Sequence, residues 1–201
     1  MKSVYDFIVK PVGERYANTK KIGDTDLIVN TKIENWKFVN RFAEVVSTPL
    51  ALATPVRVGD IVVLHQNVFR RFYDMRGKQT NSRSFFKDDL YFASVDQLYL
   101  YKRKNTWSSL NNRCFVMPIE NSDALSHEKE QKNIGILKIG NSSLEALEIT
   151  PGHLVTFKAG SEWEFNIDNE RLYCMKSNDI LLNHGYKENE AEYNPRWAES
   201  G

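Results

Sequence analysis

The stretch Val56-Arg57-Val58-Gly59-Asp60-Ile61-Val62-Val63-Leu64 decides the fold. Its central glycine suits a turn, because glycine adopts positive φ at little steric cost, and the aliphatic residues that follow favour a strand. The second half of the chain repeats the pattern as Ile149-Thr150-Pro151-Gly152-His153-Leu154-Val155-Thr156-Phe157. Each copy predicts a turn that launches an alternating strand, and the recurrence indicates an internal repeat.

Other segments recur in the same order on either side of that stretch. The matched pairs are Phe7–Val12 with Phe115–Ile119, Ala43–Val46 with Gly135–Ile139, and Asp89–Leu100 with Glu170–Leu182. Within the last pair, Ser94-Val95-Asp96 and Ser177-Asn178-Asp179 predict turns held by side-chain-to-backbone hydrogen bonds. Four matched segments in one order indicate a duplicated chain.

The repeated segments are rich in Val, Ile, Phe and Tyr, and no stretch of helical length keeps an apolar period of 3.6 residues. We therefore expect a mainly β protein with little helix. The polar stretch Lys102–Arg113, with Trp107 as its one large apolar residue, predicts a linker between the two copies. The expected domains are residues 1–103 and 113–182, followed by a polar tail, 183–201. The tail is expected to be loosely held apart from Tyr186, Tyr193 and Trp197, which could lie on a neighbouring surface.

Composition excludes several classes of protein. Hydrophobic residues make up 41% and charged residues 26%, which are ordinary values for a globular chain. With 27 Lys and Arg against 26 Asp and Glu, no long-range field draws the whole molecule to nucleic acid, so any such binding is expected to be local. Residues 1–10 lack the apolar run of a signal peptide and no stretch is long enough to span a bilayer, which predicts a cytoplasmic protein without a membrane partner.

Residues typical of catalysis or metal binding show no readable pattern. Cys114 and Cys174 are too few and too far apart for a disulfide framework, and we expect two reduced, half-buried thiols. The histidines are scattered, and the sequence has no nucleophile elbow, zinc-protease motif or phosphate-binding glycine loop. We therefore expect no catalytic residues, no metal and no cofactor.

The two copies differ most after their first strand. In the first copy a long loop, about residues 12–42, contains the aliphatic triplet Leu27-Ile28-Val29 among polar residues, whereas the matching loop of the second copy, 118–135, is about half as long. The triplet is either another core strand or a tethered hydrophobic plug for a partner. Each plug side chain buried on a partner contributes about 1.5–3 kcal/mol before ordering costs. Several plugs on one ring would bind together at high effective concentration.

The ordered set of segments resembles the GroES-type co-chaperonin family over roughly residues 5–101 and, more faintly, 113–182. The segments that carry the resemblance are the first strand Phe7–Pro11, the loop triplet Leu27–Val29, the Glu-Val-Val segment Ala43–Val46, the Val-Gly-Asp strand Val58–Leu64 and the closing Asp-Ile-Leu segment Ser177–Leu181. Two departures are Thr25-Asp26, where the family usually has a glycine pair, and Ser94-Val95-Asp96-Gln97-Leu98 in place of the closing motif of copy one.

The resemblance implies two tandem antiparallel β-barrels that assemble into a ring through strands at the chain ends. It implies that Leu27, Ile28 and Val29 insert into a groove between apical helices of a GroEL-like chaperonin, and that the ring caps the folding chamber. ATP would be held by the chaperonin and not by this protein. The tandem form is similar to divergent co-chaperonin-like proteins of bacteriophages, which implies a location in the cytoplasm of a bacterial host.

A second insert, His65–Phe86, interleaves basic and aromatic residues. Its cations are Arg70, Arg71, Arg76, Lys78 and Arg83, and its rings are Phe69, Phe72, Tyr73, Phe85 and Phe86. One interpretation is a long hairpin that packs its rings on the barrel and leaves its charges in solvent. The alternative is a binding or virion-associated structural module that uses this insert for nucleic-acid or protein contacts, since cations suit phosphates and rings suit bases.

Overall fold

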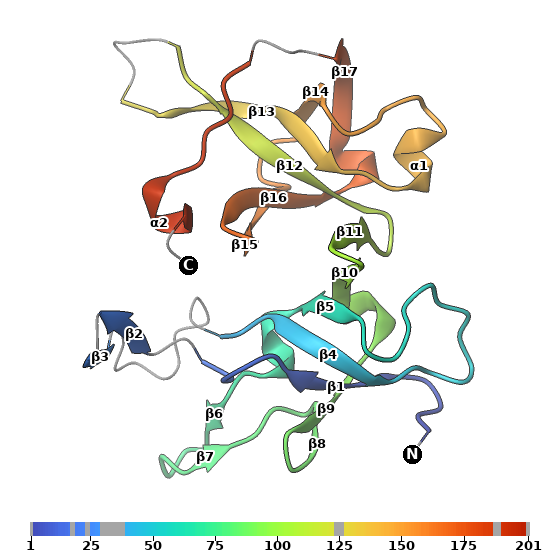
Figure 1. The fold of residues 1–201 in the computed structure, drawn as a ribbon, viewed down its shortest axis with the longest axis vertical. Helices are drawn as coiled ribbons and strands as arrows, with labels where there is room; N and C mark the ends of the chain where they lie inside the picture. Colours follow the sequence, from blue (N-terminus) through green and yellow to red (C-terminus); the bar gives the residue numbers. More distant parts are fainter. Residues whose placement is uncertain are drawn as a thin grey trace. The chain divides into compact units, whose positions relative to one another are not determined.

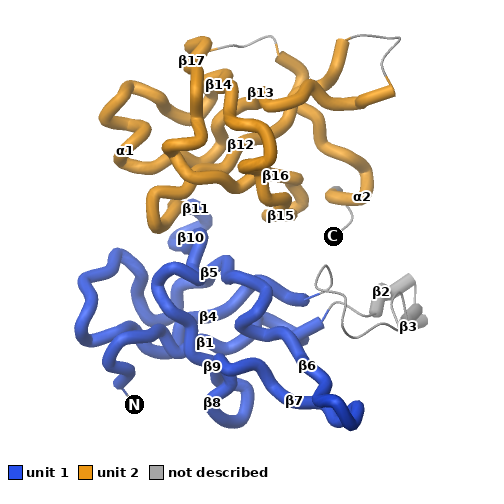
Figure 2. The backbone as a smooth tube through the Cα atoms, turned by 180° about the vertical axis from the view of Figure 1, so that it is seen from behind, with its two compact units in different colours: residues 1–107 blue, residues 108–201 orange. Residues whose placement is uncertain are grey.

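The computed structural model describes residues 2–16, 19–22, 25–28, 39–122, 127–186 and 190–199, and for 19–22, 25–28 and 199 it describes the backbone alone. The chain divides into two compact units, Met1–Trp107 and Ser108–Gly201 (Figure 2). Both consist mainly of antiparallel strands, so the predicted β class is confirmed. In the described part of the chain, the longest helices are single turns of four residues.

The first unit contains ten strands and the start of an eleventh (Figure 1). They are β1 (Phe7–Pro11), β2 (Thr19–Ile22), β3 (Thr25–Ile28), β4 (Phe42–Ser47), β5 (Ile61–Leu64), β6 (Phe72–Tyr73), β7 (Gln79–Thr80), β8 (Phe85–Lys87), β9 (Leu90–Ala93), β10 (Leu98–Arg103) and β11 (Thr106–Ser109). The second unit has the remaining elements. They are β12 (Arg113–Glu120), β13 (Glu130–Ile139), α1 (Ser142–Glu145), β14 (His153–Phe157), β15 (Trp163–Ile167), β16 (Glu170–Lys176), β17 (Ile180–Tyr186) and α2 (Arg196–Glu199).

The two units share one strand order. The sheet of the first runs β11-β10-β5-β4-β1-β9-β8, and the sheet of the second runs β17-β14-β13-β12-β16-β15. Apart from the additional β11, each strand of the seven-stranded sheet has a counterpart at the same place in the sheet of the second unit, whereas the hairpins β2–β3 and β6–β7 are found in the first unit alone among the described residues. The duplication predicted from sequence is therefore confirmed at the level of topology. Within the described residues neither ladder closes on itself.

Matching backbone hydrogen bonds extend the equivalence to single residues. Gly59 N donates to Val45 O and Gly152 N donates to Leu137 O, both at 2.8 Å. Both glycines have positive φ, 88° and 95°, so the predicted glycine turns are confirmed. The strands that follow do not alternate as expected: β5 begins at Ile61, and its next three residues are all buried. Both faces of β5 are covered by the chain, which removes the need for a polar face.

The turns predicted before the last strand of each copy are also present, but their equivalent residues are shifted by one position from the sequence alignment. A 3-10 turn over Val95–Gln97 precedes β10, and one over Ser177–Asp179 precedes β17. In each, the last side chain accepts the N–H of the residue before the turn: Gln97 from Ser94, and Asp179 from Lys176. Gln97 thus corresponds to Asp179, so the serines that were aligned by sequence do not correspond.

The boundary between the units lies after Trp107, within the predicted linker. The linker itself contains strands, because Lys102 and Arg103 end β10 and Thr106–Ser109 form β11, which pairs with β10. The predicted tail is not loosely held: residues 183–186 belong to β17, and Glu192 forms a bridge with Ile119 of β12. Distant side chains bind this tail, which a local pattern cannot reveal.

Candidate binding surfaces

The predicted plug lies on a hairpin of the first unit. Strands β2 and β3 pair antiparallel, with Leu27 opposite Lys20 and Ile28 opposite Thr19. Part of the long loop therefore has regular backbone, in a two-stranded sheet separate from the large one. Val29 and the side chains of Leu27 and Ile28 lie outside the described residues.

Hydrogen bonds close the base of this loop into a narrow neck, formed by residues 12–16 and 39–42. Val12 N donates to Phe42 O at 3.0 Å, and Asn40 N donates to Arg15 O at 2.9 Å. The Asn40 side chain donates to the carbonyls of Val12 and Glu14, at 2.7 and 2.8 Å, and accepts the Phe42 N–H at 2.8 Å. One amide thus fixes both ends of the loop to the sheet.

The neck also holds the second insert. The Arg15 guanidinium donates to Phe69 O at 2.8 and 3.2 Å and to the Asn81 side chain at 3.0 Å. It lies over the ring of Tyr91, 5.0 Å from the centroid. Burial lowers the pKa of Arg15, and the nearby charge of Arg71 lowers it further. Sequence reasoning missed Arg15, because its partners are carbonyl and amide groups far along the chain.

The insert His65–Phe86 has a fixed root and a projecting hairpin (Figure 1). At the root Phe69 is fully buried against Tyr91, with ring centroids 4.9 Å apart, and the buried Ser82 hydroxyl donates to Val68 O at 2.6 Å. Beyond the root, β6 and β7 form a short hairpin whose tip residue Met75 is fully exposed. The expectation that the rings pack on the sheet is therefore met at the root and not along the hairpin.

The five predicted cations of the insert occupy two positions. Arg70 and Arg71 are half-buried near the root, where each guanidinium lies over a ring: Arg70 over Phe72 at 5.2 Å and Arg71 over Tyr16 at 5.0 Å. The exposed cations lie along the hairpin and just after it. They are Arg76, Lys78 and Arg83. The structure therefore separates two half-buried arginines from three exposed cations.

A cluster in the second unit was not predicted. Arg171 donates to Glu130 at 2.5 Å, to Glu164 at 2.8 Å and to the Tyr173 hydroxyl, which in turn donates to Glu130 at 2.6 Å. Burial, with the Glu130 hydrogen bond, raises the pKa of Tyr173. Burial opposes the charge on Arg171, but its hydrogen bonds to the two glutamates outweigh this and raise its pKa. The Arg171 guanidinium also lies 6.0 Å from the Trp197 ring of α2, so this cluster ties the C-terminal segment to the sheet.

The cysteines are more deeply buried than expected, and both are free thiols. Cys114 pairs with Met175, and Phe115 pairs with Cys174, so the two thiols point to opposite faces of the sheet and cannot form a disulfide. Burial raises the pKa of Cys114 to about 12. This thiol is therefore protonated and unreactive at neutral pH.

Other side chains considered for chemistry have structural contacts. His184 Nε2 lies 2.8 Å from the Thr156 hydroxyl, and His153 Nδ1 lies 3.2 Å from the Asn183 amide oxygen. Asn141 caps α1 by accepting from the N–H groups of Ser143 and Leu144. Among the described residues, no three His, Cys, Asp or Glu side chains gather in a way that could hold a metal ion.

No helix in the described ranges has the length and apolar character needed to cross a membrane. A comparison with protein-family models found no match for this chain. A search of curated proteins likewise found no matching relative.

Proposed function

We propose that this protein is a co-chaperonin-like lid, built from two tandem GroES-type barrels, which docks on a GroEL-type chaperonin ring and caps its folding chamber. The observation that carries the proposal is a strand order shared by both units, combined with a long necked loop in the first unit. The duplicated sheet supplies the scaffold, and the loop supplies the contact. The ATP of the cycle belongs to the chaperonin, and the lid acts by binding without catalysing a reaction.

Burial in the first strand of each unit supports a barrel-like scaffold. In β1, Phe7, Ile8 and Val9 are all buried, and in β12 the whole run from Cys114 to Ile119 is buried. A strand covered on both faces needs layers of chain on either side, as in a sheet curved around a core. The core of the second unit includes Val116, Leu137, Val155 and Met175.

The free energy of binding through the loop would be a sum of small contributions from individual side chains. Leu27, Ile28 and Val29 would each contribute about 1.5–3 kcal/mol on burial, before the cost of ordering the loop. A single loop would bind weakly, whereas several loops on one ring bind at high effective concentration. The neck reduces the ordering cost, because Asn40 already holds both ends of the loop at the sheet.

Co-sedimentation with GroEL-type rings and nucleotide tests the proposal. The intact chain is compared with the variant Leu27→Ser/Ile28→Ser/Val29→Ser. We expect nucleotide-dependent binding by the intact chain and loss of binding by the variant. The matched control is Leu50→Ser/Leu52→Ser/Val58→Ser, which removes three exposed aliphatic side chains elsewhere in the first unit and is expected to bind normally. Absence of binding by the intact chain across rings of plausible hosts, or equal binding by the loop variant, would overturn the proposal.

A further inference from the structure

Most of the insert His65–Phe86 is the connection between two strands of the sheet, β5 and β8. Strands β5 and β8 correspond to β14 and β15, which are joined by the short connection 158–162. The insert carries five cationic side chains and one carboxylate, whereas the chain as a whole has a net charge of +1. The remainder of the molecule is therefore net negative. Positive charge is concentrated on the connection between β5 and β8, whose counterpart in the second unit is short.

The described part of the chain offers no carboxylate partner to the cations of this segment. Asp74, its only carboxylate, accepts the backbone N–H groups of Arg76 and Lys78 at 2.9 and 2.8 Å. Within the described residues, none of the five cations forms an ion pair, and the buried Nε atoms of Arg70 and Arg71 have no hydrogen-bond partner. An anionic partner would supply counter-charges for the exposed cations.

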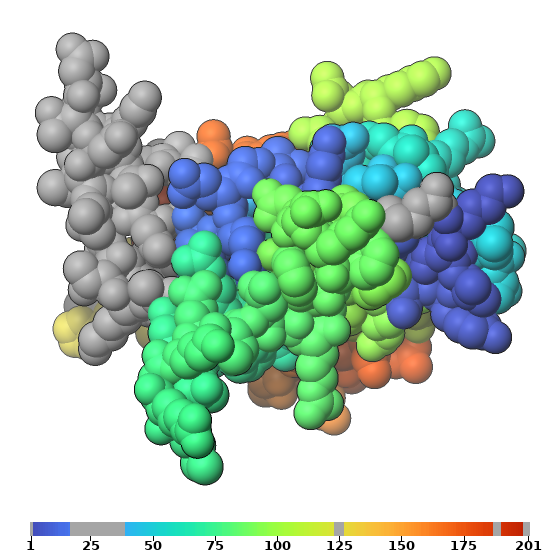
Figure 3. Space-filling view, turned by 90° about the horizontal axis from the view of Figure 1, so that it is seen from below, coloured from blue at the N-terminus to red at the C-terminus, as the bar shows by residue number. Residues whose placement is uncertain are grey.

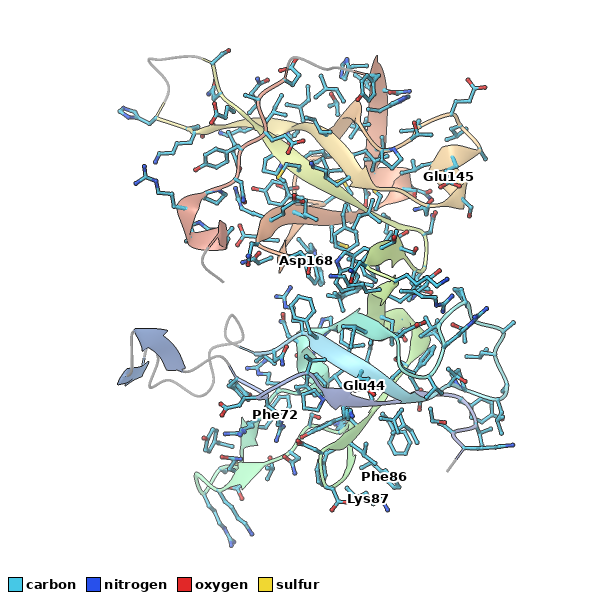
Figure 4. The ribbon with its side chains drawn as sticks, in the orientation of Figure 1. Glu44, Phe72, Phe86, Lys87, Glu145 and Asp168 are labelled. Atoms are coloured by element: carbon cyan, nitrogen blue, oxygen red, sulfur yellow. The ribbon has the colours of Figure 1, made fainter. Side chains whose placement is uncertain are left out.

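Two rings of the insert are exposed, and each lies beside one cation; Figure 4 labels both rings. Phe72 on β6 and Phe86 on β8 are each 39% exposed. Arg70 lies over Phe72 at 5.2 Å, and Lys87 lies over Phe86 at 5.6 Å. Seen from below, the hairpin and the β8–β9 turn project from the first unit as separate green ridges (Figure 3). Exposed rings beside cations form stacking platforms for bases, with charge for the phosphates between them.

We propose that this face binds single-stranded nucleic acid, with Phe72 and Phe86 stacking on bases and Arg76, Lys78 and Arg83 contacting phosphates. An acidic protein would satisfy the charges but would leave both rings in water, so the rings favour nucleic acid. Sequence-tolerant binding is expected, because every base presents a face for stacking. The inference is independent of the proposed lid function, since it uses none of the loop residues.

Fluorescence anisotropy of labelled oligo-dT and oligo-rU with the full chain tests this inference. We expect saturable binding that weakens as salt rises, and the tighter of the two oligomers identifies DNA or RNA as the partner. Phe72→Ser/Phe86→Ser should weaken binding by roughly tenfold or more, as base–aromatic stacking predicts. Arg76→Gln/Lys78→Gln/Arg83→Gln should flatten the slope of log K against log salt by about 2, since each single-strand phosphate contact contributes about 0.7.

The matched control Lys104→Gln/Lys129→Gln/Lys158→Gln removes three exposed cations outside the insert and should bind like the intact chain. Circular dichroism checks that every variant is folded. Absence of saturable binding at low salt overturns the inference, and so does an equal loss in the lysine control. A different result would indicate an acidic protein partner and overturn the inference. In that case the intact chain and the ring variant would bind polyglutamate equally, and the ring variant would bind oligonucleotide as tightly as the intact chain. The loop-triplet variant should bind oligonucleotide normally, which separates this outcome from failure of the lid proposal.

Discussion

At the residue scale, Gly135 marks a close approach between two strands. It pairs with Pro118, just as Ala43 pairs with Pro11 in the first unit. A Cβ on Gly135 would lie 2.6 Å from the Cγ1 of Val116 and closer still to the carbonyl oxygen of Met117. The backbone oxygen cannot move aside without displacing β12. The second unit thus requires a glycine where the first accepts an alanine.

We therefore expect Gly135→Ala to lower the free energy of unfolding by about 1–3 kcal/mol, the usual cost of overpacking a core. Denaturant unfolding measures the effect. The matched control is Gly140→Ala, whose new Cβ would meet only the Leu137 side chain at an ordinary 3.5 Å, and which should change stability by no more than about 0.5 kcal/mol. Equal stability of the two variants would show that β12 and β13 are not this close.

At the scale of elements, an ion pair between the buried Asp60 and the partly exposed Arg103 joins the turn before β5 to the end of β10. Asp60 accepts from the Arg103 guanidinium at 2.5 and 3.1 Å and from the Arg57 N–H at 2.8 Å. Burial by itself raises the pKa of the Asp60 carboxyl, but these hydrogen bonds outweigh it, and the net pKa is below the ordinary value. The aspartate of the Val-Gly-Asp motif thus closes its own turn and fastens two strands.

Asp60→Asn should lower the free energy of unfolding at neutral pH by about 1.5–3 kcal/mol, the usual contribution of hydrogen bonds to a charged group. A carboxyl with a lowered folded-state pKa stabilises the fold above its ordinary pKa, and this contribution is lost as pH falls through the folded value. The difference between the intact chain and the variant should therefore shrink below about pH 4. Unfolding curves measured across acid pH check this.

The exposed pair Lys10–Glu44 provides the control, because its atoms lie 3.0 Å apart with both side chains largely in water. Glu44→Gln should change stability by less than about 1 kcal/mol at any pH. A pH-independent effect of Asp60→Asn would contradict the assigned role of the carboxylate.

The elements also show what could be read from sequence. Runs of β-branched residues beside a turn glycine predicted the strands at β5 and β14, because both signals are local. The hairpin β6–β7 and the tail carry no such periodicity. The tail is held by contacts such as Arg171 N to Asn194 and Asn166 to Ala198 O, which join residues far apart in sequence. No local pattern encodes these contacts.

The contrast between local patterns and long-range contacts also explains which residues of the candidate surfaces were predicted from sequence. Composition and spacing found all five cations of the insert and its rings. They could not distinguish Phe69, which is fully buried, from Phe72, which is 39% exposed, because that depends on where the root meets Tyr91. Arg15 was missed for a related reason, since a guanidinium bound to a carbonyl leaves no trace in charge patterning.

At the scale of the whole molecule, we expect β17 to be the surface for the self-association that the lid proposal requires. It is the last strand of its sheet, and Leu181, Leu182 and Tyr186 on it are each at least 57% exposed. An edge strand with exposed apolar side chains favours pairing with another chain. If the partner is a sevenfold chaperonin, the lid should be a ring of seven chains with seven loops and fourteen barrels.

Light scattering after size exclusion should then give a mass seven times that of the 23.3 kDa chain. Leu181→Ser/Leu182→Ser should shift the mass toward the monomer, because it removes apolar contact area from the edge strand. The control Leu147→Ser, which changes an exposed leucine beside α1, should leave the mass unchanged. A stable monomer of the intact chain would argue strongly against a ring.

The hydrogen bonds of Arg15 have a thermodynamic consequence for the two proposed contacts. Arg15 belongs to the neck of the loop, and it also binds the carbonyl of Phe69 at the root of the insert. A partner that displaced the neck would alter those bonds, and the two proposed contacts would then be linked. Linkage is reciprocal: if a chaperonin on the loop changes the affinity of the insert for its ligand, that ligand changes the affinity of the loop for the chaperonin by the same factor.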